Sequence, residues 1–125
     1  MKKLKTMKGL HNQAWTLMSE FVRRRDRGQC FTCYDKRDWK QQQAGHYVHR
    51  DCLDYDFRNI NCQCVRCNKW LRGNLTAYAM ALKAKYGAEI IDELEILGHQ
   101  IRKFTRDELE GIIEELKKRI SQLPR

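Results

Sequence analysis

The sequence predicts an α+β protein that is mainly helical, with a zinc-held centre between N- and C-terminal helices. Apolar side chains recur at helical spacing at both ends of the chain, while residues 29–63 show little helical periodicity. Two Cys-x-x-Cys pairs bracket this irregular centre. We therefore divide the chain into a basic N-terminal helix (1–28), a zinc-bound core (29–87) and a C-terminal helical region (88–125).

Local signals place the first three helices. Residues 10–26 have helical apolar spacing and end in a basic turn followed by Gly28. Asn74 is a typical N-cap for a helix that runs to Tyr86. Residues 88–97 then form a further short helix, and the cysteine-rich centre before Asn74 is expected to hold a short hairpin and loops.

The last helix has the clearest start signal in the chain. Thr105 and Glu108 have the spacing of a capping box. The helix that follows carries a long apolar stripe from Leu109 to Leu123. This stripe either covers the core of the chain or forms a self-association face, so residues 88–125 are a candidate dimerisation region.

The charge of the chain favours a polyanionic partner. Its 125 residues include 25 Lys and Arg against 16 Asp and Glu, a formal net charge of +9. Residues 1–50 hold 12 basic and four acidic side chains, whereas residues 51–125 hold 13 and 12. Nucleic acid is the commonest partner of such a basic half, although basic charge also serves solubility alone. The cluster Arg23, Arg24 and Arg25 is either a DNA-backbone contact or a solvated helix end.

Nothing in the sequence indicates a membrane partner. No run of roughly 18 apolar residues is present, and the basic N-terminus lacks the apolar stretch of a signal peptide. We expect a cytoplasmic location, in the host cell if the chain is phage-encoded. In a reducing compartment, cysteines are more often metal ligands than disulfides.

The cysteine spacing predicts a structural zinc site. Two residues between cysteines let both thiolates reach one ion from a tight turn, and four thiolates close a tetrahedron with no open position. The expected ligands are Cys30, Cys33, Cys64 and Cys67. A redox role and a tighter pairing of Cys62 with Cys64 are the alternatives. Cys52 and Cys62 are expected to be buried or partly buried free thiols.

The loop between the pairs carries a family pattern. Its motifs are Ala44-Gly45-His46-Tyr47, Arg58-Asn59-Ile60, Gln63-Cys64-Val65-Arg66-Cys67-Asn68 and, further on, Gly73-Asn74-Leu75 with Tyr78. The pattern resembles the HNH (ββα-metal) nucleases, including the endonuclease VII-like Holliday-junction resolvases, and is more similar still to the phage NinG (Rap) recombination protein family. The resemblance covers residues 30–87. It implies a zinc-pinned ββα-metal (HNH-like) core with flanking N- and C-terminal helices.

The resemblance and the chemistry of the residues suggest the same roles. A neutral imidazole such as that of His46 can take a proton from water near neutral pH, which suits a catalytic general base. Mg²⁺ or Mn²⁺ can bind the phosphate, and the carboxamide oxygen of Asn68 is a hard ligand for it, although Asn68 can also be only a helix cap. Asn59 is expected to hydrogen-bond to backbone and hold the His46 strand. His49 is a surface side chain, a second metal ligand or a substitute base.

One position departs from the nuclease pattern. Many HNH nucleases have aspartate directly before the histidine, where this chain has Gly45. The missing carboxylate has candidate replacements in His49, Asp51, Asp54 and Asp56, and the sequence does not choose among them. Basic side chains that surround the motif and can meet phosphates are Arg50, Arg58, Arg66 and Lys69.

Three functional hypotheses follow. The first is an endonuclease for branched DNA, such as Holliday junctions and other recombination intermediates; two symmetrical cuts then imply a homodimer. The second is an HNH nuclease that acts on ordinary duplex DNA. The third is a non-catalytic zinc-dependent nucleic-acid-binding module, which would be indifferent to loss of His46. Under all three, zinc binding is expected to be coupled to folding of the centre.

Overall fold

The computed structural model describes residues 4–124 of the chain. Its elements are α1 (Met7–Arg25), the 3₁₀ turn η1 (Trp39–Gln41), β1 (Gln43–His46), the 3₁₀ turn η2 (Asp51–Leu53), β2 (Ile60–Gln63), the π-helical turn η3 (Arg66–Trp70), α2 (Leu75–Tyr86), α3 (Ile90–Gly98) and α4 (Arg106–Ser121). The α+β, mainly helical fold class is confirmed. Residues 1–3 of the predicted 1–28 region and residue 125 of the last region lie outside the described residues.

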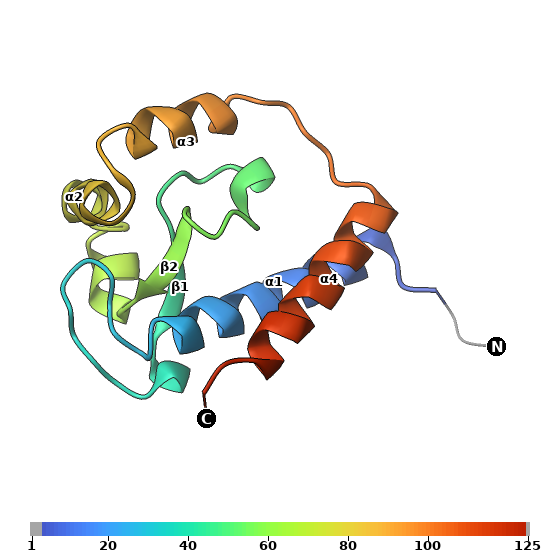
Figure 1. The fold of residues 1–125 in the computed structure, drawn as a ribbon, viewed down its shortest axis with the longest axis horizontal. Helices are drawn as coiled ribbons and strands as arrows, with labels where there is room; N and C mark the ends of the chain where they lie inside the picture. The colour runs from blue at the N-terminus through green and yellow to red at the C-terminus, as the bar shows by residue number, and fades with distance from the viewer. Residues whose placement is uncertain (1–3, 125) are drawn as a thin grey trace.

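The two strands form the centre of the molecule. β1 and β2 pair antiparallel, with Ala44 opposite Cys62 and His46 opposite Ile60. In Figure 1, α1 and α4 lie side by side on one side of this hairpin, and α2 and α3 lie on the other. The predicted hairpin within residues 29–63 is confirmed, and it places His46 at the end of β1.

The apolar stripe of α4 is buried against α1. Leu109 and Ile113 form one buried cluster with Leu10 and Ala14 of α1. Leu116 joins a second cluster, which also contains Met18, Phe21 and Val22 of α1 together with Ile60 of β2. The stripe therefore covers the core of this chain, and a dimerisation role for residues 88–125 stays a prediction.

Helix ends follow the sequence signals with two differences. α1 begins at Met7, three residues before the predicted start, because the hydroxyl of Thr6 accepts a hydrogen bond from the backbone N–H of Gly9 (3.0 Å). The Thr105 capping box is confirmed. Asn74 does precede α2, but its backbone is left-handed (φ 48°) and its side chain does not cap the helix. No helix within residues 4–124 is both long and apolar enough to cross a membrane.

Candidate functional site

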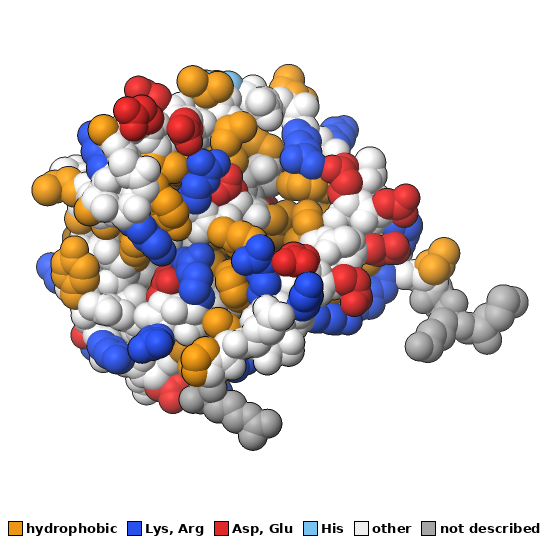
Figure 2. Space-filling model, in the orientation of Figure 1, with side chains coloured by type: hydrophobic (Ala, Val, Ile, Leu, Met, Phe, Trp, Pro, Cys, Tyr) orange, Lys and Arg blue, Asp and Glu red, His pale blue; other side chains and the backbone are white. Residues whose placement is uncertain are grey.

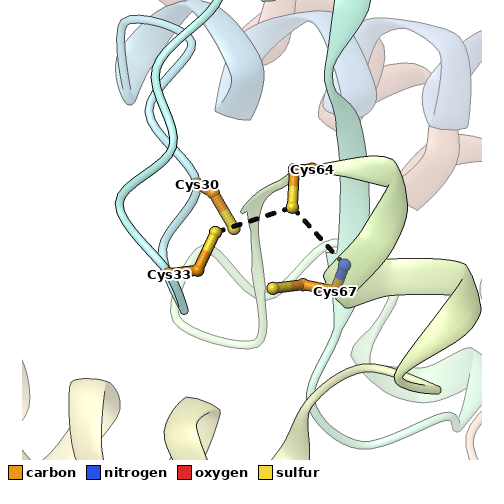
Figure 3. Close-up of side chains that lie close together, drawn as sticks. All are labelled: Cys30, Cys33, Cys64 and Cys67. Carbon is orange, nitrogen blue, oxygen red and sulfur yellow. Dashed lines mark hydrogen bonds between the residues drawn. The ribbon is translucent and has the colours of Figure 1, made fainter.

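The four predicted zinc ligands meet at one point. Cys30 and Cys33 lie in the loop after α1, Cys64 follows β2 and Cys67 lies in η3, and Figure 3 shows their side chains converging. Their sulfur atoms all lie within 4.8 Å of one another, and Sγ of Cys33 is 3.6 Å from Sγ of Cys64. Zn–S bonds of about 2.3 Å place tetrahedral ligands roughly 3.8 Å apart. The cluster therefore fits one tetrahedral metal ion.

Polar groups around the cluster support thiolates. The backbone N–H of Cys67 donates to Sγ of Cys64 (3.4 Å), and the hydroxyl of Thr32 lies 3.3 Å from Sγ of Cys30. Nδ2 of Asn74 donates to Sγ of Cys67 (3.6 Å). Hydrogen bonds of this kind orient metal ligands and stabilise their charge. The sequence predicted Asn74 as a helix cap. Its hydrogen bond to Cys67 depends on the left-handed backbone at Asn74, which the sequence does not show.

The four thiols do not all ionise without a metal. Burial raises the pKa of Cys33 to about 12. Burial also acts to raise the pKa of Cys30, but hydrogen bonds from Thr32 and from backbone outweigh it and lower that pKa to about 7. Binding of a metal therefore releases protons, since metal ligands must be thiolates.

The other two cysteines lie outside the cluster, as predicted. Cys62 is buried in β2, and burial raises its pKa to about 12. Cys52 is partly buried and lies in η2. Among the residues that the structure describes, only the two Cys-x-x-Cys pairs form a group of metal-ligating side chains. The alternative pairing of Cys62 with Cys64 is therefore wrong.

His46 forms a second polar centre, with Asp54. Its Nε2 lies 2.9 Å from Oδ1 of Asp54, and because an ionised carboxylate only accepts, the imidazole donates. The ring stacks on Trp15 of α1 (centroids 4.9 Å apart) and on His49 (5.1 Å). The His46 side chain keeps 19% of its surface exposed. Trp15 is a contact that helical spacing alone does not reveal.

The fold distinguishes among the candidate replacements for the missing carboxylate. Asp54 contacts His46 directly. Asp56 instead accepts two hydrogen bonds from the guanidinium of Arg58. His49 lies beside His46, and burial, followed by the neighbouring His46 charge, lowers the pKa of its imidazole. Asp54 and His49 thus contact His46, whereas Asp51 begins η2 and has no hydrogen bond to His46 within the described residues.

Asn59 and Tyr78 hold the hairpin in place. Oδ1 of Asn59 accepts from the backbone N–H of Val48 (2.8 Å), and its Nδ2 donates to the carbonyls of Val48 (3.0 Å) and Leu53 (3.4 Å). These are the bracing contacts that the sequence predicted for Asn59. The buried hydroxyl of Tyr78 donates to the carbonyl of Gly45 (2.8 Å), directly before His46. Both side chains therefore position the end of β1, and a catalytic role for Asn59 stays a prediction.

Asn68 lies on the other face of the hairpin from His46. Its Nδ2 donates to Oε1 of Gln43 (2.8 Å), and its Oδ1 lies 3.0 Å from the position that a Cβ on Gly45 would occupy. Successive strand residues point to opposite faces, so Gly45 faces Asn68 while His46 faces α1. The structure therefore does not bring Asn68 into contact with His46.

Gln63 explains why glycine precedes His46. A Cβ at Gly45 would lie 1.8 Å from Oε1 of Gln63, so the carboxamide fills the space of a side chain at position 45. Nε2 of Gln63 donates to Thr32 and to the carbonyl of Gly73, whereas its buried Oε1 has no hydrogen-bond donor. Oε1 of Gln63 and Oδ1 of Asn68 thus approach the same point. Sequence reasoning assigned Gln63 no role, because only the register places it beside Gly45.

Two of the basic residues predicted to bind DNA have structural partners. Arg25 donates to Asp26, to Asn61 and to the carbonyls of Phe57 and Ile60, which ties α1 to the hairpin. Arg58 bridges Asp56 and Glu93. Both guanidiniums are therefore occupied within the fold.

The remaining predicted DNA contacts differ in accessibility, and Arg23 and Arg24 are only partly exposed. Arg23 stacks on Trp39 (5.0 Å to the ring centroid), and Arg24 pairs with Glu20 on the same helix. Three further basic side chains are exposed, namely Arg50, Arg66 and Lys69. Phosphate binding by these three exposed residues stays a prediction.

The fold and the cysteine cluster define a small α+β protein with a four-thiol site that can hold a metal ion. The family profile described as "Bacteriophage Lambda NinG protein" matches residues 1–125, and the chain belongs to the NinG family. The chain is 34% identical over 115 residues to Protein ninG of Escherichia phage lambda, which covers 89% of this chain and 55% of the relative.

Other relatives give the same result. Protein ninG of Salmonella phage P22 is 34% identical over 115 residues, covering 89% of this chain and 56% of the relative. Protein ninG of Enterobacteria phage H19B is 35% identical over 103 residues, covering 80% and 51%. The chain thus spans about half the length of the curated relatives it matches. No solved structure gives a significant match.

Proposed function

We propose that this chain is a metal-dependent DNA endonuclease that hydrolyses phosphodiester bonds in branched DNA, with His46 as general base. The observation that carries the proposal is the placement of His46. The residue ends β1 of an antiparallel hairpin, its Nε2 is held by Asp54, and the turn that carries Asn68 follows β2. This is the order strand, strand, helical turn that the resemblance to ββα-metal nucleases implies.

The His46–Asp54 pair suits proton abstraction from water. Because Nε2 donates to Asp54, the other ring nitrogen, Nδ1, is the one that can accept a proton. The carboxylate stabilises the imidazolium that forms and fixes the ring. Stacking on Trp15 restricts ring rotation while part of the ring stays exposed. Asp54 acts in this proposal as a positioning residue.

The partly exposed carboxamide of Asn68 fits the role of a cation ligand. Oδ1 of Asn68 and the donor-free Oε1 of Gln63 converge beside Gly45, and carboxamide oxygens are ligands that Mg²⁺ accepts. When bound, Mg²⁺ or Mn²⁺ supplies positive charge to the phosphate and to the leaving oxygen. Gln63 is fully buried, so of the two carboxamides only the partly exposed Asn68 could share a cation with phosphate oxygens of bound DNA.

The same carboxamides favour one alternative function. Gln63 fills the position of the usual carboxylate, and the Asn68 face of the hairpin offers neutral oxygens where many nucleases have an acid. A non-catalytic zinc-dependent DNA-binding module would have no need of that acid. This alternative predicts DNA binding without cleavage and indifference to loss of His46.

Cleavage of a labelled four-way junction, beside a linear duplex of the same sequence, tests the proposal. We expect cleavage of the junction by the zinc-loaded protein when Mg²⁺ or Mn²⁺ is present. His46→Ala should slow cleavage by roughly 10²- to 10⁴-fold, the usual contribution of a general base. The matched control is His99→Ala, because His99 is an exposed histidine at the end of α3, outside the His46–Asp54 pair.

Each outcome separates the hypotheses. Junction cleavage that is lost in His46→Ala and kept in His99→Ala supports the nuclease. Equal cleavage of junction and duplex retains the chemistry and removes the branch preference. Binding of both DNAs without cleavage, with either metal, would replace the nuclease with the zinc-dependent binding module.

A further inference from the structure

An exposed tryptophan lies on the turn that follows the second cysteine pair. Trp70 is 79% exposed, at the end of η3 and three residues after Cys67. A large aromatic ring in water is unusual without a binding role, since indoles normally bury most of their surface. Trp70 has no role in the His46 site or in the hydrophobic clusters described above. The exposed indole of Trp70 is therefore a candidate binding residue for a ligand.

The side chains around Trp70 are basic. Arg66, Lys69 and Arg72 belong to η3 or directly follow it, and all three are exposed. No ion pair within residues 4–124 involves any of them. Figure 2 shows exposed hydrophobic side chains among Lys and Arg at the edge formed by α2 and the turn before it. An indole among unpaired cations is complementary to a polyanion that also carries aromatic rings.

The cysteine cluster and the tight turn after it anchor the backbone that carries the indole. Cys67 lies within η3, and the backbone N–H of Gly73 donates to the carbonyl of Cys67 (2.8 Å). The residues that follow Trp70 form a tight turn with positive φ at Arg72 (51°) and Gly73 (95°). A backbone anchored in this way loses little conformational freedom when the ring binds, which favours affinity.

We propose that Trp70 stacks on an unpaired or unstacked DNA base, while Arg66, Lys69 and Arg72 contact the flanking phosphates. The proposal rests on DNA as the substrate, and it adds the feature that distinguishes a branch or single strand from intact duplex. Bases in an intact duplex are stacked on one another and offer no free face. At a branch point or in a single strand, a base face is available to an aromatic side chain.

DNA binding without cleavage tests this inference. Zinc-loaded protein is titrated, in the absence of Mg²⁺ and Mn²⁺, into a fluorescent four-way junction, a single strand and a perfect duplex, with anisotropy as the readout. Trp70→Ala should weaken binding to the junction and the single strand by about 5- to 150-fold and leave duplex binding nearly unchanged. Trp70→Phe keeps an aromatic ring and should retain most of the affinity.

Two further variants distinguish base stacking from phosphate binding and from the loss of any exposed apolar side chain. Ile101→Ala removes a fully exposed apolar side chain (99%) outside the basic turn and should bind all three DNAs like the unmodified chain. Lys69→Ala should weaken binding to every DNA and lower the slope of log K against log salt by about 1. Trp70→Ala should not change that slope.

Three results would contradict stacking of Trp70 on an unstacked base. If Trp70→Ala binds the junction as tightly as the unmodified chain, the indole does not contact DNA, while the His46 nuclease proposal stands. If Trp70→Ala loses duplex and junction affinity equally, Trp70 does not read unstacked bases. If the unmodified chain binds none of the three DNAs, this inference and the proposed function both fail.

Discussion

Replacement of Gly45 by alanine tests how tightly the hairpin is packed beside His46. The new Cβ would lie 1.8 Å from Oε1 and 2.7 Å from Cδ of Gln63, far inside van der Waals contact. Gln63 is fully buried, so its carboxamide cannot move into solvent without opening the core. It must give up the hydrogen bonds of its Nε2 to Thr32 (3.1 Å) and to the carbonyl of Gly73 (2.9 Å).

The expected cost follows from those two bonds. Each buried hydrogen bond contributes about 1 kcal/mol, and each polar group left without a partner costs about 1–3 kcal/mol. Gly45→Ala should therefore lower the free energy of unfolding by roughly 2–5 kcal/mol. Gly111→Ala is the matched control, because a Cβ at Gly111 meets nothing within 4 Å. That change lies within α4 and should stabilise the chain by up to about 1 kcal/mol.

Urea unfolding of the zinc-loaded protein, followed by circular dichroism, measures both changes. The cause is isolated by a double-mutant cycle with Gln63→Ala. On that background the obstructing carboxamide is absent, so Gly45→Ala should cost less than about 1 kcal/mol. If Gly45→Ala alone stays within about 0.5 kcal/mol of the unmodified chain, or costs the same on both backgrounds, the packing described beside His46 is wrong.

Four further perturbations have defined outcomes. A zinc chelator or Cys64→Ser should lower the Tm in a thermal melt, whereas Cys52→Ser, outside the cluster, should change it little; equal effects would contradict a structural zinc. Zinc affinity should also fall with falling pH in calorimetric titrations, because the Cys33 thiol, whose pKa burial raises to about 12, must lose its proton. Tyr78→Phe should cost about 1–3 kcal/mol in urea unfolding by removing the buried hydrogen bonds of the hydroxyl with the carbonyl of Gly45 and with Nδ2 of Asn61, and an unchanged midpoint would exclude those bonds. Thr105→Ala should cost about 1 kcal/mol by removing the capping box of α4, and an unchanged midpoint would contradict that cap.

Local signals in the sequence predicted much of the fold. The capping box at Thr105 and the apolar spacing of the helices depend on residues a few positions apart. Both can therefore be recognised in the sequence without the tertiary structure. The four-cysteine cluster was predictable for a related reason: two residues between cysteines fix the geometry of each pair. The position of His46 at the end of a strand followed from its resemblance to a known pattern.

The contacts that the sequence did not predict depend on packing between distant segments. Trp15 stacks on His46 across 31 positions of the chain because α1 lies against the hairpin. Gln63 reaches Gly45 because the strands pair in one particular register. Asn74 occupies the expected N-cap position, but a left-handed backbone turns its side chain toward Cys67. Each case needed the three-dimensional path of the chain.

Chemical rescue of a His46 variant is the most direct test of the central claim that this imidazole is the general base. Single-turnover cleavage of a four-way junction by His46→Gly would be measured with Mg²⁺, with and without added imidazole. The proposal predicts cleavage slowed by roughly 10²- to 10⁴-fold, and partial recovery that grows with the concentration of neutral imidazole. Cleavage by His46→Gly at the rate of the unmodified chain would show that His46 is not the base and would contradict the account.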